Sequence, residues 1–325
     1  MRVSLGQPPK RWLWLPWLLA ACSSGGGPPT TSQPKGGARD WAAHPVFALE
    51  AQPAARVWVA SDIHGGIDRF IALLQGQSLI DANRAWSAGV DHLYVLGDLI
   101  DKAEGGLSTI RFLQGLQAQA AAAGGEVVVT MGNHEAEFLA NPMNDKASPF
   151  LKDLADANLD PVAVAAGADV GAWMRALPIG IVDGDWFFSH AGNTRGLSLA
   201  ALEADIRTDV DDHGFGGRSL AAPNSILEAE LWWETADPTA TADASLAGLP
   251  AKHLVFGHDP AALGQKRGSV GQLLDGRLFP VDAGMSPAVN DSQGALLLLE
   301  RDGTAGTTTV SAAFPAGPPG MIFQE

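Results

Sequence analysis

The sequence predicts an α/β fold, because short apolar runs alternate with helix-like segments through its first half. A strand–helix–strand order of this kind favours parallel pairing with right-handed crossovers. The longer of the two helix-like segments stops at Gly124 and Gly125, as helices often do. The expected strands are at 56–60, 92–96 and 126–130, and the expected helices are at about 67–75 and 107–123.

The second half of the chain predicts a largely antiparallel arrangement, because its strands are short and separated by tight turns. The segment 144–176 reads as mostly helical but is broken by Pro149, Pro161 and Gly167, so it could form a cap or side lobe. Strands are expected at 179–183, 186–189, 253–256, 295–300 and about 307–313, with a hairpin over 270–281 that turns at Asp275-Gly276. Helices are expected at 198–206 and 225–234, and a surface loop is expected at 236–249.

Composition narrows the class of protein. The chain has 325 residues, 46% of them hydrophobic, which is enough for a sizeable globular core. Its formal net charge of −15 argues against nucleic acid or an anionic membrane surface as a partner, because both attract basic patches. Its single cysteine, Cys22, excludes an intramolecular disulfide.

The N-terminus predicts a lipoprotein signal peptide over residues 1–21. Basic residues precede an apolar run at 12–21 that is too short to span a bilayer. Small residues then stand directly before Cys22, which resembles a bacterial lipoprotein processing site and implies cleavage before Cys22 with a lipid on its thiol. An ordinary secretory signal with an incidental cysteine is the alternative.

Residues 22–39 are rich in Gly, Pro, Ser and Thr, which predicts a flexible tether rather than a folded segment. The folded domain is therefore expected over residues 40–325. With a lipid at Cys22, the chain would be anchored to the bilayer of a bacterial cell envelope, facing the periplasm or at the outer membrane. Ser23 and Ser24 resemble the pattern of outer-membrane lipoproteins.

Polar side chains follow five of the expected strands at the point where each strand ends. Ligands in α/β sheets collect at the carboxyl ends of strands, so these side chains are expected to meet. Carboxylate oxygens and imidazole nitrogens suit a borderline divalent metal such as Mn, Fe or Zn, and Asp98 could bridge two ions through its two oxygens. The candidate metal ligands are Asp62, His64, Asp98, Asn133, His190 and His258.

Five sequence blocks carry a resemblance to the calcineurin-like metallophosphoesterases. They are DIHG at 62–65, GDLID at 97–101, GNHE at 132–135, SHAG at 189–192 and GH at 257–258. The chain is most similar to the phosphoprotein phosphatase branch, which includes Shewanella-like phosphatases and diadenosine tetraphosphatases. GNHE, SHAG and the presence of Pro260 where many other members have a second histidine point to this branch. The resemblance implies a four-layer α/β/β/α sandwich with two mixed central sheets.

The resemblance also implies a role for each matched residue. Asp62 and His64 would hold a first divalent metal ion together with Asp98, which would bridge to a second. Asn133, His190 and His258 would complete the second site. His134 would not bind metal. It would act as the general acid, oriented by Asp101.

The family's usual phosphate-binding arginines are missing at two positions, where this chain has Lys102 and Met131. Lysine is a point charge and cannot make the bidentate contact of arginine. Lys102 and Arg195 are the candidate phosphate contacts, and Arg195 could equally be a solvated surface charge.

The expected function is that of a membrane-anchored, extracytoplasmic, metal-dependent phosphatase. It would hydrolyse phosphomonoesters, either of phosphoproteins or of small organic phosphates. One alternative is a hydrolase of nucleotides or dinucleoside polyphosphates. Another is a non-catalytic surface binding module on the same fold, since fold alone does not establish function. The sequence leaves the identity of the two metals and the oligomeric state open.

Overall fold

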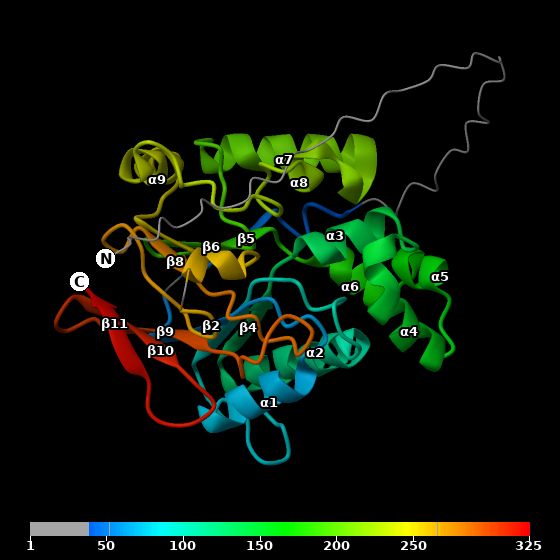
Figure 1. Ribbon diagram of the computed structural model, residues 1–325, viewed down its shortest axis with the longest axis horizontal. Coiled ribbons are helices and arrows are strands. Elements are labelled where there is room, and N and C mark those ends of the chain that lie inside the picture. Colours follow the sequence, from blue (N-terminus) through cyan, green and yellow to red (C-terminus); the bar gives the residue numbers. More distant parts are fainter. Residues whose placement is uncertain (1–38, 52, 265) are drawn as a thin grey trace, which may run out of the picture. The chain divides into compact units, whose positions relative to one another are not determined.

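The computed structural model describes residues 39–325, except residues 52 and 265 (Figure 1). The predicted signal peptide, Cys22 and all but the last residue of the predicted tether lie outside the described residues. Within the described residues, no helix is both long and apolar enough to cross a membrane.

A six-stranded sheet contains the three strands of the first half, and they pair in parallel as predicted. Antiparallel strands from the C-terminal part extend the same sheet. In spatial order the strands are β11 (Gly320–Gln324), β10 (Thr307–Ala313), β9 (Leu296–Asp302), β2 (Arg56–Ala60), β3 (His92–Val95) and β4 (Glu126–Val129). Helices α1 (Ile67–Gly76) and α2 (Gly106–Ala123) connect the parallel strands and cover the outer face (Figure 1).

The prediction of a largely antiparallel second half is confirmed for β9, β10 and β11 but is wrong for most of a second, five-stranded sheet. In this sheet only the β5–β6 pair, joined by a tight turn, is antiparallel, and every other pair is parallel. Parallel neighbours need long crossovers, and the chain between β6 and β7 supplies one that contains helices. In spatial order the strands are β1 (Phe47–Leu49), β5 (Gly180–Asp183), β6 (Trp186–Ser189), β7 (His253–Phe256) and β8 (Leu278–Pro280).

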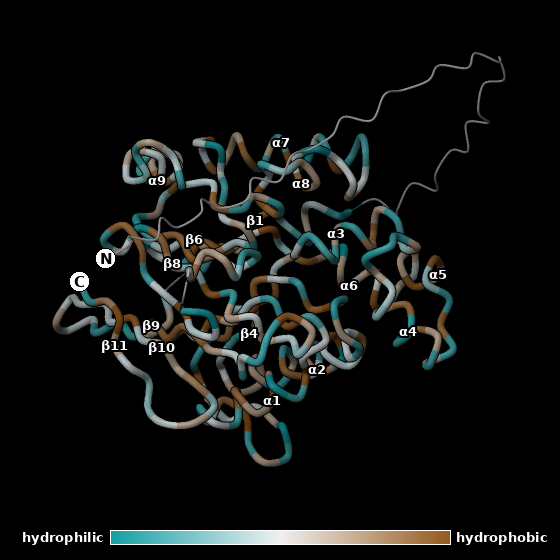
Figure 2. The backbone as a smooth tube through the Cα atoms, in the orientation of Figure 1, coloured by the Kyte–Doolittle hydropathy of each residue, from teal (hydrophilic) through white to brown (hydrophobic). Residues whose placement is uncertain are grey.

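The two sheets pack face to face over a shared apolar core. Val57 and Val59 of β2 belong to this core, with Ile181 and Phe188 of the second sheet. Trp58, between the two valines, faces the other way into the core beneath the helices. Both faces of β2 are therefore buried, which explains its continuous apolar run. The strands of both sheets are largely brown, or hydrophobic, in Figure 2, and teal segments lie mainly at the periphery.

Helices α7 (Leu199–His213), α8 (Arg218–Ala221) and α9 (Pro238–Ala247) lie on the side of the five-stranded sheet (Figure 1). The order of layers is thus helices, sheet, sheet, helices, as the resemblance implied.

Two predictions for this part of the chain were wrong. Residues 236–249 contain α9 rather than a loop, and Asp237 caps this helix by accepting a hydrogen bond from the Ala240 amide.

Residues 225–234 form turns rather than the expected helix. Contacts with the second sheet explain the turns, since Ile226 O accepts the Ala191 amide and Trp232 Nε1 donates to Ala191 O. The hairpin expected at 270–281 is reduced to β8 and one bridge between Leu273 and Leu278. Strands β1 and β11 were not predicted.

The segment 144–176 is helical, and it packs beside α3 (Asn133–Ala140). Pro149 does not break a helix but stands near the start of one, where its missing amide costs nothing. Asp153 ties this segment to the start of α2 by accepting hydrogen bonds from the Gly105 and Leu107 amides. Its elements are the 3₁₀ turn Asp145–Ala147 and helices α4 (Ser148–Asp156), α5 (Pro161–Ala166) and α6 (Val170–Ala176).

Candidate metal centre

The carboxyl ends of β2, β3, β4, β6 and β7 meet, and they bring the predicted ligands together. The loops after β2 and β3 are joined directly, since the His64 amide donates to Asp98 O at 2.9 Å. The side chains gathered here are almost completely buried, except for the partly buried His258. They are Asp62, His64, Asp98, Asn133, His134, His190 and His258.

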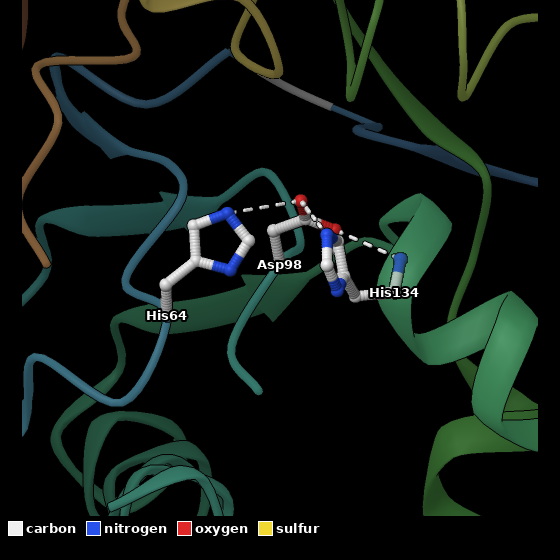
Figure 3. Close-up of side chains that lie close together, drawn as sticks. All are labelled: His64, Asp98 and His134. Carbon is white, nitrogen blue, oxygen red and sulfur yellow. Dashed lines mark hydrogen bonds and ion pairs between the residues drawn. The ribbon is translucent and has the colours of Figure 1, made fainter. Parts of the chain in front are cut away.

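Asp98 lies between two imidazoles, one facing each of its oxygens. His64 Nε2 is 3.3 Å from Asp98 Oδ2, and His190 Nε2 is 3.4 Å from Asp98 Oδ1. Figure 3 shows the His64 ring turned toward the Asp98 carboxylate, with His134 at the start of α3 on the other side. A carboxylate whose two oxygens face separate nitrogen donors is placed to bridge two ions.

Hydrogen bonds to the backbone fix the orientation of two of these rings. His64 Nδ1 is 2.9 Å from Ile100 O, and His190 Nδ1 is 2.7 Å from Leu96 O. A ring that donates Nδ1–H to a carbonyl presents the lone pair of Nε2 to the site. This arrangement is typical of histidines that bind metals.

Several buried polar atoms here lack the partner that such atoms normally have. Asp62 Oδ1 and His64 Nε2 make no hydrogen bond within the part of the chain that the structure describes. Asn133 Oδ1 faces acceptor atoms, including His190 Nε2 at 3.1 Å, and only an inverted amide would donate to His190 and Asp98. An amide oxygen pointing inward is the orientation that a cation requires. The donor set therefore fits divalent metal ions.

The electrostatics of the centre leave Asp98 negative. Although burial opposes ionisation, the neighbouring histidines, His190 first, hold the pKa of Asp98 well below its usual range. The charge of Asp98 in turn raises the pKa of His190 to about 10 against the effect of burial, so a metal ion that binds Nε2 would have to displace a proton. Burial lowers the pKa of His64 and of His258 to about 3, so both rings are neutral, as ligands must be.

His134 differs from the other histidines in its partner. Its Nδ1 is 2.8 Å from Asp101 Oδ2, while its Nε2 is 3.9 Å from Asp98 Oδ2, which is too long for a hydrogen bond. His134 lines the open pocket beside the centre. Position alone would also allow His134 to ligate, since it offers a ligand atom within 4.8 Å of those of His64 and Asp98.

The backbone at the ligands is strained. Asp62, His64, Asp98 and His258 have φ of 54°, 45°, 54° and 65°, a left-handed conformation that costs residues other than glycine about 1–3 kcal/mol each. Close packing surrounds them. A Cβ atom at Gly132 would lie 2.2 Å from Asp98 Oδ1, so no larger residue fits there. Such strain is concentrated at functional sites.

The sequence did not assign a role to Glu135. In the structure its side chain joins the loop after β3 to the loop after β4. Its carboxylate accepts the amides of Leu99 at 2.8 Å and of Asp98 and Gly132 at 2.9 Å each. Burial, with the charge of Asp98, raises its pKa to about 7. Its place in the GNHE block was the available signal.

A pocket of about 520 Å³ opens onto the centre, and only one of the two candidate phosphate contacts lines it. Lys102 lines this pocket. Arg195 does not, and its guanidinium pairs instead with Asp205. Lys146 and Glu228 also line the pocket, and sequence patterns alone did not single them out.

Comparisons with known proteins agree with this geometry. A family model described as calcineurin-like phosphoesterase matches residues 55–273. The chain is 29% identical over 164 residues to the symmetrical bis(5'-nucleosyl)-tetraphosphatase of Cronobacter sakazakii, covering 47% of this chain and 48% of that protein. It is 30% identical over 80 residues to Shewanella-like protein phosphatase 2 of Arabidopsis thaliana, covering 25% and 20%. The chain thus spans about half, or less, of the length of these curated relatives.

Solved structures share the fold over most of the chain. A cold-active protein-tyrosine phosphatase of a psychrophilic Shewanella species has a TM-score of 0.70 and 25% identity, covering 86% of this chain and 82% of that one. A serine/threonine phosphatase from Saccharomyces cerevisiae has a TM-score of 0.55 and 14% identity, covering 84% of each chain. The second likeness concerns the fold alone.

Proposed function

The chain belongs to the calcineurin-like phosphoesterase family, and we propose that it is a metal-dependent phosphatase that hydrolyses phosphomonoesters. One observation carries the proposal: nitrogen donors face each oxygen of Asp98, and the His134–Asp101 pair stands at the open side of the same centre. When bound, two divalent ions would activate water and neutralise charge on phosphorus and on the departing oxygen.

The residues of the chain would divide the remaining work. Asp62, His64 and Asp98 would hold one ion, and Asn133, His190 and His258, with Asp98, the other. A bond would form from the oxygen of water to phosphorus while the ester P–O bond breaks. His134 Nε2 would donate a proton to the departing oxygen, and the Asp101 carboxylate, 2.8 Å from Nδ1, would hold the ring in place.

Lys102 is the proposed phosphate contact, because it lines the pocket beside His134. A lysine can attract the phosphate but cannot hold it through two parallel hydrogen bonds. Substrate orientation would then depend more on the metal ions and on the rest of the pocket. Arg195, paired with Asp205 and away from the pocket, is left out of this proposal.

A second candidate is the hydrolysis of nucleotides or dinucleoside polyphosphates. The similarity of this chain to proteins named symmetrical bis(5'-nucleosyl)-tetraphosphatase supports this candidate. The same two-metal chemistry would also cleave a phosphoanhydride bond. A third is a binding module without turnover. The binding module is the less favoured candidate, because each matched ligand position keeps a residue that can bind metal.

We also propose that the enzyme works outside the cytoplasm of a bacterial cell, anchored by a lipid on Cys22. The short apolar run and the small residues before Cys22 support this location. Incorporation of a labelled fatty acid into the chain, and its loss in Cys22→Ala, is the expected result. Labelling that persists in Cys22→Ala would contradict it.

The decisive experiment is phosphate release by the purified chain, loaded with Mn²⁺, from a panel of substrates. The panel holds an aryl phosphate, phosphoserine and phosphotyrosine peptides, nucleotides and a dinucleoside tetraphosphate, with Asn133→Ala and His134→Ala as comparisons. Metal-dependent release that falls in both variants would support the proposal, and the preferred substrate would decide between the candidates. Bound metal without turnover would favour a binding module. Neither metal nor turnover would overturn the site.

A further inference from the structure

A second pocket, about 300 Å³ in volume, adjoins the pocket at the metal centre. The two share Asn133, Asp145, Lys146 and Glu228 in their linings. Because Asn133 is also a proposed metal ligand, the second pocket opens directly beside the place where a phosphoester would react. We refer to it as the side pocket. Its volume is at the lower end of the range of small-molecule sites, about 300–1,000 Å³.

Helix α3 forms one wall of the side pocket. Asn133, Ala136, Glu137 and Ala140 line it, and their spacing places them on one face of the helix. This face begins at the metal centre and continues away from it. The two alanines leave room that larger side chains would fill.

The opposite wall comes from the chain after α7. Phe215 and Leu220 line the side pocket, and they are only 5% and 1% exposed. A Cβ atom at Gly216 would lie 3.2 Å from the Cβ of Ala140, so the two walls approach closely here. Small residues therefore stand where the two walls meet, and large apolar residues also line the pocket.

Three charged residues of the side pocket lie where the two pockets meet, and a fourth, Glu137, pairs with one of them. Lys146 Nζ is 2.5 Å from Glu137 Oε1, and Glu228 and Asp145 line the same boundary. A second phosphate group would meet these carboxylates and would then lose its hydration among the alanines, Phe215 and Leu220. An uncharged, flat, apolar group meets neither obstacle.

From these contacts, and resting on the proposed function, we propose that the side pocket binds the aromatic ring of the leaving group of an aryl phosphomonoester. Ala136, Ala140 and Leu220 would set this preference through the space they leave. The phosphoryl group would lie at the metal centre, and the ring would extend along α3. Alkyl phosphates would use only the first pocket.

The test compares two ligands that the enzyme cannot hydrolyse, benzylphosphonate and ethylphosphonate. Their affinities for the Mn²⁺-loaded full chain are measured by calorimetry. The same is done for Ala140→Leu and Ala221→Leu, which fill the side pocket from opposite walls. Ala122→Leu, on an exposed part of α2, is the matched control. Thermal unfolding of each variant checks that it folds.

The wild-type chain is expected to bind benzylphosphonate at least about 10-fold more tightly than ethylphosphonate, since small changes in apolar fit are worth about 10–200-fold. Both filled variants should lose this preference and keep their affinity for ethylphosphonate, and Ala122→Leu should keep both. The ratio of kcat/KM for phenyl phosphate to that for ethyl phosphate should fall by the same factor in the filled variants.

Equal binding of the two ligands by the wild-type chain would overturn the side-pocket inference and leave the proposed function standing. So would a preference that survives both filling substitutions. If the loaded chain binds neither phosphonate and hydrolyses neither ester, the proposed function fails, and the inference fails with it.

Discussion

The two ends of the paired sheets compensate buried charge in different ways. At the carboxyl ends of β2 and β3, Asp62 Oδ1 and His64 Nε2 make no hydrogen bond with any of the described residues. At the opposite end, the Asp183 carboxylate accepts a hydrogen bond from Tyr94 Oη at 3.0 Å and pairs with Arg301 at 3.2 Å. One oxygen of Asp183 also lacks a hydrogen bond, but an internal cation balances its charge.

The comparison distinguishes a structural ion pair, at the Asp183 end, from a candidate site for an external ligand, at the carboxyl ends of β2 and β3. Asp183 and Arg301 join the two sheets with groups that the chain itself supplies. At the ligand end Glu135 joins two loops, protonated His190 balances part of the buried charge, and bound cations would balance the rest. Substitutions at the ligand end should therefore affect metal binding and turnover first, and those at the opposite end should affect stability first.

The largest effect is expected for Asp98→Asn, because Asp98 faces both proposed metal sites. Turnover should fall by about 10³-fold or more, and the bound metal should fall from two ions per chain to one or none. Phosphate release and elemental analysis measure the two quantities. Asp302→Asn, at the exposed end of β9, is the control. Two tightly bound ions in Asp98→Asn would contradict the bridging role.

His134→Gln should lower kcat by about 10²–10⁴-fold while both metal ions remain bound. The loss should be greater for an alkyl phosphate than for a nitrophenyl phosphate, because a poor leaving group needs the proton more. Asp101→Asn should lower kcat less than His134→Gln does, and its loss should also be greater for the alkyl phosphate than for the nitrophenyl phosphate. Kinetics with the two esters test this, and loss of metal in His134→Gln would show that His134 is a ligand rather than the acid.

At the opposite end, Arg301→Met should destabilise the fold by about 3 kcal/mol, because it leaves the fully buried Asp183 without its cation. Metal content and kcat should remain close to those of the wild-type chain. Urea unfolding measures the first and the phosphatase assay the second. The double variant with Asp183→Asn should recover part of the loss. A selective loss of metal in Arg301→Met would remove the distinction between the two ends.

The smallest effect is expected at Glu50, also at the opposite end. Burial, with the charges of Glu126 and Asp183, raises the pKa of Glu50 from 4.5 to about 7. The folded chain thus binds this proton more tightly than the unfolded chain, so stability is retained below pH 4.5 and declines as the pH rises to about 7. Glu50→Gln should remove this decline and raise Tm at pH 8 by about 1–4 °C, with no gain at pH 4.5. Thermal unfolding across this range checks the sign.

The parallel half of the fold could be predicted because its strands are buried on both faces. Val57, Trp58 and Val59 form an unbroken apolar run for this reason. The pairing in the second sheet could not be predicted, because a short strand such as β7 has the same apolar pattern whether its neighbour is parallel or antiparallel. At 236–249, the cap at Asp237 and the following Pro238 were readable signals, but the Ala/Thr/Asp composition favoured a loop.

The candidate ligand positions followed from the motifs, and their convergence, which the structure shows, followed from the rule that strand ends meet. The side pocket could not be predicted in this way. Ala140 is far from Phe215 and Leu220 in the sequence, and only the packing of α3 against the segment after α7 brings them together. Glu135 lay inside a motif, but its three backbone partners depend on two loops meeting.

Helix α3 carries His134 in its first turn, and the helix face that begins at the neighbouring Asn133 lines the side pocket. A bulky residue that displaces this helix to change the preferred substrate would also displace His134, the proposed proton donor, so the rate and the selectivity would change together. Variation from the opposite wall, at Leu220, avoids that linkage. Altered specificity without loss of rate should thus be easier to obtain, by selection or by engineering, in the segment after α7 than in α3.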